Sequence, residues 1–450
     1  MTSDLSLASH PASAPTDPAP TDARMRRRVV LASILGNGLE WFDFVSYGYF
    51  ASIIAKVFFP AGSDLALMLT YATFAVGFLV RPIGGIVLGA YADRHGRRQA
   101  LSLLIVMMAF GTLTLGLTPA YASIGILAPI IVVLGRVVQG ISIGGEFGSA
   151  TALLVEYAPP NRRMMYGSFQ MSSQAIGRVL ATSIGLPVLL LLPPATVQDG
   201  AWRIPFLIGS LIGPFGFYVR YRLAESPEFV KLLAHKADAA RAPVREVLRH
   251  HWLEVISAIG LTIIGTSLTY IWNTYLPTYV VEQLHLPLWQ GLFGVAVTSA
   301  VGIGTCILGG FLADVYGPYR TFFLFTAISA LISYPMLAYV LAAPGFGRLF
   351  LAQFMVLTVF GLLQGSGPGL LAGLFPVSVR STGMAISYNV GVTVFGGFAP
   401  LTVTWLIATT GNKLMPAFYI IAAAMLSIVV VGSTLGSVRR RAAETLLPEN

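Results

Sequence analysis

The chain has 450 residues, of which 55% are hydrophobic and only 10% are charged, with 28 basic and 19 acidic side chains. Soluble proteins carry about 25% charged residues, so this composition excludes a cytosolic enzyme, a disordered acidic chain and a secreted disulfide-rich protein. It indicates a protein that crosses a membrane many times, in which the basic excess reports orientation rather than nucleic-acid binding. The single cysteine, Cys306, excludes an internal disulfide and a cysteine-based metal cluster.

Residues 1–27 begin with a stretch rich in Ala, Pro, Ser, Thr and Asp that lacks the apolar core of a signal peptide, so we predict a disordered cytoplasmic tail. Twelve apolar segments follow, each close to the roughly 20 residues that a membrane-spanning helix requires. They cover residues 30–54, 67–91, 100–118, 125–152, 165–191, 204–220, 254–281, 290–312, 321–342, 349–374, 382–409 and 415–437. Most are continuous apolar runs, which favours helices over barrel strands.

The distribution of basic residues predicts how these spans are oriented. The two tails, alternate loops and one adjoining helix end hold 21 of the 28 Lys and Arg, whereas the opposite loops and helix ends hold four. By the positive-inside rule, both termini are therefore cytoplasmic. The predicted organisation is an N-terminal bundle at 28–220, a cytoplasmic linker at 221–253, a C-terminal bundle at 254–437 and a cytoplasmic tail at 438–450.

The two halves of the chain repeat weakly. Matching residues recur at offsets of 216 to 225 positions, for example Gly84 and Gly85 as Gly309 and Gly310, and Gln139 as Gln364. Two bundles in the same orientation are typical of transporters that rock around a site near the middle of the membrane. We therefore predict an all-α membrane protein with twelve transmembrane helices in two pseudo-symmetric six-helix bundles.

The most specific motif begins within the second span and continues into the loop that follows it. It reads Arg81-Pro82-Ile83-Gly84-Gly85 and continues to Asp93-Arg94-His95-Gly96-Arg97-Arg98. Its glycines allow close helix packing, and Asp93 can cap the next helix and pair with Arg97. Here the chain resembles the major facilitator superfamily, in which this loop latches the two halves on the cytoplasmic side. The resemblance implies that the gate residues are Arg81, Gly85, Asp93, Arg97 and, in a degraded second copy of the motif, Asp314.

Further segments resemble the metabolite:proton symporters within that superfamily. They are residues 36–44 (GNGLEWFDF), 136–140 with 144–146, 202–206, 225–229 and 395–397 with Pro400. Residues 55–60 and 67–70 look most like the citrate and tricarballylate proton symporter branch. Shikimate, 2-oxoglutarate, proline/betaine and dicarboxylate carriers share the same frame, so they stay open as alternatives.

Six charged side chains lie within the predicted spans away from their ends, all of them in the first half: Glu40, Asp43, Arg81, Arg136, Glu146 and Arg178. Each costs about 2.5–3.5 kcal/mol to insert and is a functional candidate for that reason. No histidine lies within a span, so a proton carrier must be a carboxylate. We predict proton coupling by Glu40, Asp43 and Glu146, with Arg136 facing an acid of the first span. A fixed salt bridge within the bundle is the alternative.

A polar stripe in the fifth span predicts the substrate site. Gln170, Gln174 and Arg178 recur at every fourth position, so they share one face of a helix. A guanidinium is always charged and binds a carboxylate through two parallel hydrogen bonds. We predict that Arg178 docks an anionic substrate. A pair between Arg178 and Glu40 or Asp43 is the competing interpretation.

The second half offers uncharged partners for the same substrate. The candidates are Tyr270, Asn273, Gln364 and Asn389, together with Asn37 of the first span. These side chains can bind hydroxyl and carboxylate oxygens, or can join one helix to another. The sequence shows no nucleotide-binding loop, zinc-ligand spacing or nucleophile motif.

The predicted function is import of a small organic anion, such as citrate or a related carboxylate, by proton symport through alternating access. A carrier of another metabolite, a transporter-like sensor and a channel are the alternatives. We expect no enzymatic activity, no cofactor or metal and no nucleic-acid partner. We expect a monomer surrounded by lipid in the bacterial inner membrane.

Overall fold

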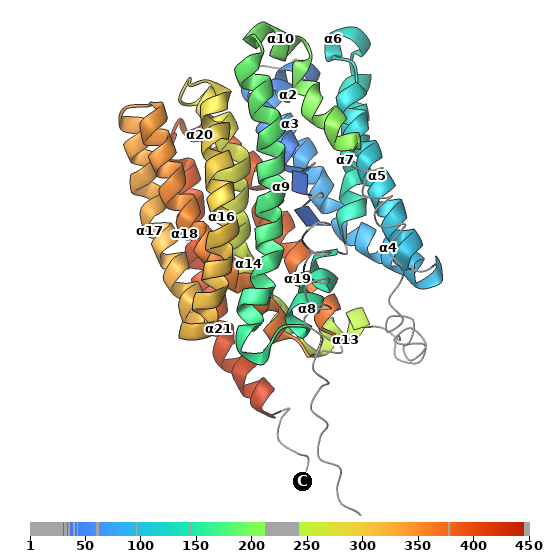
Figure 1. Ribbon diagram of the computed structural model, residues 1–450, viewed down its shortest axis with the longest axis vertical. Coiled ribbons are helices and arrows are strands. Elements are labelled where there is room, and N and C mark those ends of the chain that lie inside the picture. Colours follow the sequence, from blue (N-terminus) through green and yellow to red (C-terminus); the bar gives the residue numbers. More distant parts are fainter. Residues whose placement is uncertain are drawn as a thin grey trace, which may run out of the picture.

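The computed structural model describes residues 30, 34, 37, 38, 41, 42, 44–59, 63–95, 97–144, 146–211, 243–376 and 379–444. Every regular element in these ranges is a helix, and the helices run side by side as an elongated bundle (Figure 1). The expectation of an all-α protein is confirmed.

The N-terminal half begins with helical residues at 44–49 and continues through seven long or medium helices. These are α2 (Ala51–Phe58), α3 (Ser63–Leu79), α4 (Arg81–His95), α5 (Arg97–Leu117), α7 (Leu127–Ile143), α8 (Glu146–Glu156) and α9 (Arg163–Leu191). Short connecting helices are α6 (Tyr121–Ile124), η1 (Pro160–Arg162), α10 (Pro194–Asp199) and η2 (Ala201–Arg203), and residues 204–211 are helical again.

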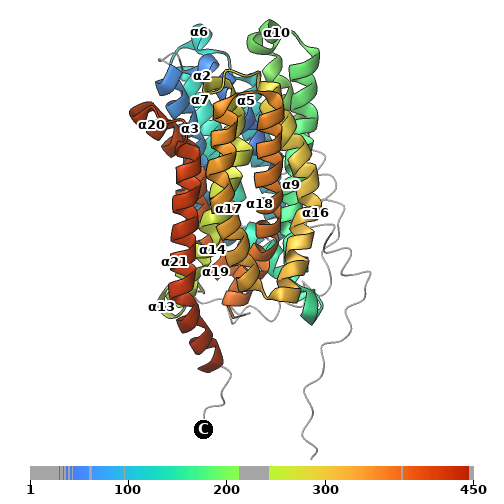
Figure 2. The ribbon, with the colours of Figure 1, turned by 90° about the vertical axis from the view of Figure 1, so that its left-hand side faces the viewer.

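The C-terminal half begins with α13 (Pro243–His250), the described end of the predicted linker. It continues with α14 (Trp252–Leu268), η3 (Thr269–Tyr275), α15 (Leu276–Glu282), α16 (Leu288–Tyr316), α17 (Pro318–Ala342), α18 (Phe346–Leu374), α19 (Arg380–Val392), η4 (Thr393–Gly397), α20 (Ala399–Thr410) and α21 (Met415–Glu444). Figure 2 looks onto α17, α18 and α21, behind which the N-terminal helices lie.

Eight described helical stretches are long and apolar enough to cross a membrane: Asp64–Gly85, Pro160–Leu191, Trp252–Glu282, Leu288–Tyr316, Pro318–Ala342, Phe346–Leu374, Arg380–Thr410 and Met415–Val438. Two shorter apolar helices, Leu103–Leu117 and Leu127–Ile143, correspond to the third and fourth predicted spans. The first and sixth predicted spans and most of the linker lie partly outside the described residues.

Three spans are less regular than the sequence predicts. The fourth consists of two helices, α7 and α8, with a turn at Gly144. The seventh and eleventh contain the π-helical segments η3 and η4, in which each turn holds more residues than an α-helical turn. Apolar composition does not distinguish an α-helical from a π-helical turn, so the sequence does not predict these irregularities.

Glycine sets the distance between α4 and its neighbours. A Cβ atom at Gly84 would overlap the backbone of Ile141 on α7, and one at Gly140 would overlap the backbone of Gly77 on α3. Small residues of this kind let membrane helices approach closely enough for backbone contact. This packing fixes the start of α4, and therefore Arg81, against α7.

Candidate functional site

A hollow of about 410 Å³ lies where the two halves of the molecule meet. Its lining comes from the first span, α4, α7, α8, α9 and α19 and consists of Asn37, Trp41, Phe44, Arg81, Ile143, Phe147, Gln174, Tyr388 and Asn389. Arg81 supplies the charge in this described lining, so we call the hollow the arginine lobe.

A second hollow of about 400 Å³ adjoins the first and shares Trp41, Gln174 and Tyr388 with it. Its polar lining is uncharged and comes largely from the seventh and tenth spans, as Thr262, Thr266, Thr269, Tyr270 and Gln364. We call it the hydroxyl lobe. Each hollow has a largely apolar wall with a few polar groups, as small-molecule sites do.

Aromatic rings surround the guanidinium of Arg81. Its central carbon lies 4.1 Å from the ring centroid of Phe78 and 4.8 Å from that of Phe44. Tyr270 packs edge-on against Phe78 at 5.2 Å and approaches Arg81 closely enough for electrostatic interaction. Arg81 is only 3% exposed, so these rings hold a charge that is almost removed from water.

Five of the predicted substrate residues line the lobes. Asn37, Gln174 and Asn389 line the arginine lobe, whereas Tyr270 and Gln364, again with Gln174, line the hydroxyl lobe. Three of these side chains also donate hydrogen bonds within the protein, among them Gln364, whose amide donates to Thr269 Oγ1 at 3.4 Å. The amide of Asn37 donates to Ser173 Oγ at 2.6 Å, and that of Asn389 donates across the bundles to the carbonyl of Gly144 at 2.8 Å.

Three other predicted substrate residues, Gln170, Arg178 and Asn273, are buried but line neither lobe. The stripe does share one face of α9, yet Gln174 is its member at the cavity. Arg178 lies one helical turn further, about 6 Å along the axis, where its Nε donates to Ser299 Oγ of α16 at 3.4 Å. Its docking role stays a prediction, and the geometry favours a contact between α9 and α16.

Of the predicted coupling residues, the structure describes the side chain of Arg136. Glu40 and Asp43 lie outside the described residues, and so does the side chain of Glu146 at the start of α8. Arg136 is buried, donates to Gln139 Oε1 at 2.8 Å and lies over the ring of Tyr47 at 3.8 Å. Its coupling role stays a prediction.

The predicted gate residues fall into different places. The side chains of Asp93 and Arg97 lie outside the described part of the chain, Gly85 packs near Gly144, and Arg81 lines the cavity. Asp314 joins the bundles directly. Its two carboxylate oxygens accept the backbone N–H groups of Met164 and Met165, both at 2.9 Å. These are free donors in the first turn of α9, so Asp314 on α16 caps a helix of the other bundle.

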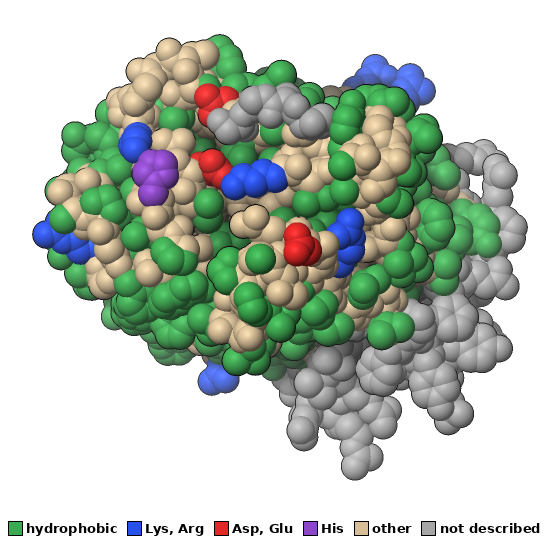
Figure 3. Space-filling model, turned by 90° about the horizontal axis from the view of Figure 1, so that it is seen from above, with side chains coloured by type: hydrophobic (Ala, Val, Ile, Leu, Met, Phe, Trp, Pro, Cys, Tyr) green, Lys and Arg blue, Asp and Glu red, His purple; other side chains and the backbone are tan. Residues whose placement is uncertain are grey.

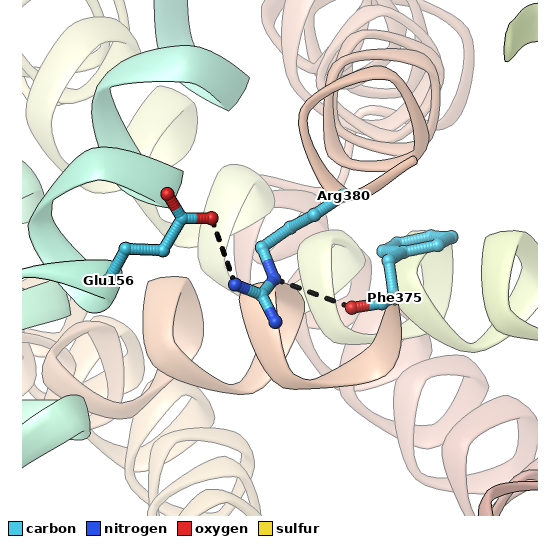
Figure 4. Close-up of polar contacts among 3 residues, drawn as sticks. All are labelled: Glu156, Phe375 and Arg380. Carbon is cyan, nitrogen blue, oxygen red and sulfur yellow. Dashed lines mark hydrogen bonds and ion pairs between the residues drawn. The ribbon is translucent and has the colours of Figure 1, made fainter. Parts of the chain in front are cut away.

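A second contact between the bundles lies at the same end of the molecule. Arg380, at the start of α19, forms an ion pair of 3.0 Å with Glu156 at the end of α8 and donates to the carbonyl of Phe375 (Figure 4). Nearer the cavity, the rings of Phe147 and Tyr388 stack with their centroids 3.5 Å apart. Together with the Asp314 cap, these contacts close the cavity at this end.

The opposite end is closed by hydroxyl and aromatic contacts. Tyr71 on α3 donates to Thr278 Oγ1 on α15 at 2.8 Å, and its ring lies 5.6 Å from that of Tyr275. The face of the molecule at this end shows only scattered charged side chains (Figure 3). Contacts between the bundles therefore lie at both ends of the molecule.

Sequence reasoning missed several cavity residues. Trp41 and Phe147 were not predicted as lining, and Arg81 was predicted only as a gate. Trp41 lies in the GNGLEWFDF segment that carries the family resemblance, which was the available signal. Phe147 lies one residue from the predicted residue Glu146, but one position along a helix turns the side chain by about 100°.

The helical fold and the polar hollows between its two bundles fit a membrane transporter, and the comparisons with known proteins show this class. Residues 33–386 match the model of the Major Facilitator Superfamily, and the chain belongs to that family. This confirms the predicted fold class and makes the protein a multi-pass membrane transporter rather than an enzyme. The orientation of its termini stays a prediction.

Particular relatives resemble the chain along nearly its whole length. The citrate-proton symporter of Klebsiella pneumoniae is 35% identical over 417 residues, which cover 92% of this chain and 93% of that protein. The proline/betaine transporter of Salmonella typhimurium is 32% identical over 421 residues, covering 91% and 83%. Among solved structures, the proton:xylose symporter XylE matches with a TM-score of 0.71 at 15% identity, covering 93% and 96%, and supports the fold alone.

Proposed function

We propose that the protein imports a small organic carboxylate together with protons, by alternating access of the central cavity to the two sides of the membrane. The observation that carries this proposal is a pair of adjoining hollows at the bundle interface, one lined by a buried guanidinium and the other by hydroxyl and amide groups. The similarity to citrate-proton symporters supports citrate or a related carboxylate as the substrate.

Contacts between the bundles at both ends of the cavity support the mechanism. In alternating access, the closed contacts at one end must break while those at the other end hold. Asp314 and Arg380 contribute at one end and Tyr71 at the other, and each of these contacts joins the two halves. The predicted carboxylates Glu40, Asp43 and Glu146 supply the proton-binding groups in this proposal.

Proline or betaine is the second candidate substrate. Trp41, Tyr270 and Tyr388 line the hydroxyl lobe, and aromatic faces attract the ammonium group of such molecules. Relatives that are named proline/betaine transporters support the same reading. The two candidates share a carboxylate and differ in whether a positive charge accompanies it.

Uptake into proteoliposomes tests the proposal. We expect labelled citrate, or proline in the second reading, to accumulate above the external concentration when the outside is acidic. A protonophore should abolish this accumulation while leaving exchange of labelled for unlabelled substrate intact. Arg348→Gln, at an exposed site near the ring of Tyr339, is the matched control and should behave as wild type. Accumulation that follows a sodium gradient instead, or flux without exchange, would contradict the proposal.

A further inference from the structure

We propose that Arg81 binds one carboxylate group of the transported substrate. This inference rests on the proposed function and assigns the anion-binding role to a residue whose motif otherwise points to gating. The three buried arginines of the N-terminal bundle offer a direct comparison, because they share chemistry and differ in position: Arg81, Arg136 and Arg178.

Arg81 is the member of this set that lines the cavity. Its side chain forms part of the arginine lobe, whereas neither of the other two guanidinium groups lines a lobe. Arg136 donates to Gln139 and stacks on Tyr47, and Arg178 donates to Ser299 on α16. A substrate in the cavity therefore meets the guanidinium of Arg81 first.

The guanidinium of Arg81 keeps hydrogen-bonding capacity for a ligand. Its Nε is buried without a hydrogen-bond partner, and the ion pairs among the described residues do not include Arg81. Nη1 of Arg178 is also buried without a partner, so the place of Arg81 in the cavity wall is what distinguishes the two residues. The side chain of Tyr270 interacts with the Arg81 guanidinium from one direction. A buried charged donor without a partner is costly, so a site of this kind is stabilised when an anion arrives.

The surrounding rings fix how an anion can approach. Phe78 and Phe44 lie within 5 Å of the guanidinium carbon and provide apolar and π contacts. Such contacts satisfy the faces of the planar group but offer nothing to its N–H groups, which point outward in the plane. A carboxylate can meet those N–H groups side by side, with two parallel hydrogen bonds.

The rest of the described lining is uncharged. The described lining of the hydroxyl lobe contributes threonine hydroxyls, two tyrosines and two glutamine amides, and Arg81 is the cation of the combined described lining. Arg81 can therefore compensate the charge of one ionised carboxylate. The hydroxyl lobe offers hydrogen-bonding and aromatic contacts to the rest of the substrate.

The test compares Arg81→Gln with Arg178→Gln, with Arg348→Gln as the control at a site outside the cavity. Arg81→Lys keeps the charge but loses the paired geometry, and it guards against the case in which the glutamine variant misfolds. Binding to the purified protein is measured by calorimetry with two matched pairs of probes: citrate and its trimethyl ester, and proline and prolinamide.

We expect the wild type to bind either citrate or proline. It should bind the matching ester or amide, which lacks the ionised carboxylate, about 10- to 100-fold more weakly. The affinity of Arg81→Gln for the carboxylate should be lower than that of the wild type by the same factor, since the partner of the carboxylate is gone. The affinity of this variant for the analogue should equal that of the wild type. Arg81→Lys should fall between wild type and Arg81→Gln. Arg348→Gln should match wild type in both.

Three results overturn the inference. One is an Arg81→Gln variant that binds the carboxylate as tightly as wild type. Another is loss of the distinction between carboxylate and analogue in Arg178→Gln alone, which would restore Arg178 as the docking residue. A wild type that binds neither carboxylate contradicts the proposed function itself, so the two failures are distinguishable.

Discussion

The two ends of the bundle interface are closed by different chemistry. At one end, which we call the Asp314 end, a carboxylate caps a helix of the opposite bundle and Glu156 pairs with Arg380. At the other, which we call the Tyr71 end, a tyrosine hydroxyl bonds to Thr278 and aromatic rings pack around it. A charge–dipole contact responds to salt and to neutralisation of the acid, whereas ring packing responds to shape.

This difference shows that the two closures can be weakened independently. Each of the following substitutions weakens the contacts at one end, and the distance between the two bundles, measured at each end, reports the result. Spin labels at positions 162 and 316 report the Asp314 end, and labels at 65 and 285 report the Tyr71 end; all four side chains are exposed. Replacing Cys306, which is buried, removes the one native thiol from the background.

Gly310→Ala should have the largest effect. A Cβ atom there would lie 2.8 Å from Met165 Cα and 2.9 Å from the Met164 carbonyl, so the backbone of one bundle must move. Overpacking of this kind costs about 1–3 kcal/mol. We expect the Asp314 end to open, seen as a longer distance across it. Gly304→Ala on the same helix meets no atom within 4 Å and should leave the distance unchanged.

Asp314→Asn should come next. The amide keeps one acceptor oxygen but loses the charge that faces the N-terminus of α9, which costs about 1–2 kcal/mol. The Asp314 end should open in a population about 10-fold larger than in wild type. Asp199→Asn, in the last turn of α10, is the control. An unchanged distance distribution would show that the cap does not hold the bundles together.

Tyr71→Phe should have a smaller effect, at the opposite end of the molecule. It removes one hydroxyl donor to Thr278 while the ring packing persists, and costs about 0.5–1.5 kcal/mol. We expect partial opening of the Tyr71 end alone. Tyr334→Phe, on the exposed surface of α17, provides the comparison. If Tyr71→Phe instead lengthened the distance across the Asp314 end, the two closures would not be independent.

Glu156→Gln should have the smallest effect. The Glu156 side chain is 40% exposed, so solvent screens its ion pair with Arg380, and such pairs contribute about 0.2–1 kcal/mol. We expect a slight opening of the Asp314 end in the wild type on raising the salt concentration and a smaller response in the variant, in which only the Asp314 cap remains sensitive to salt. A salt response that is equally large in Glu156→Gln would assign it to other charges.

Much of the fold was predictable because membrane insertion imposes a simple rule on composition. Apolar length marks the spans, and the weak repeat between Gly84 and Gly309 indicates two related bundles. The packing of α4 on α7 follows from the same glycines. Family membership and the multi-pass architecture are therefore readable from the sequence.

The site was less predictable, for a geometric reason. The stripe on the fifth span correctly indicates one polar face, but periodicity does not say which turn of that face meets the cavity. Gln174 meets it and Arg178 meets α16 instead. Arg81 was placed within the second span but assigned by its motif to the gate, whereas it is the first residue of α4, after the turn at Val80, and lines the cavity.

The π-helical segment η3 fixes the rotation, about the axis of the seventh span, between its cavity-lining residues and Thr278. Thr262, Thr266 and Tyr270 face the cavity before or within it, and Thr278 follows it to meet Tyr71. A π turn holds about one residue more than an α turn, and each residue of a helix turns the chain by about 100°. Deleting one residue there would leave the cavity wall in place and rotate Thr278 away from its partner, so this turn keeps the binding half and the closing half of one rod in register.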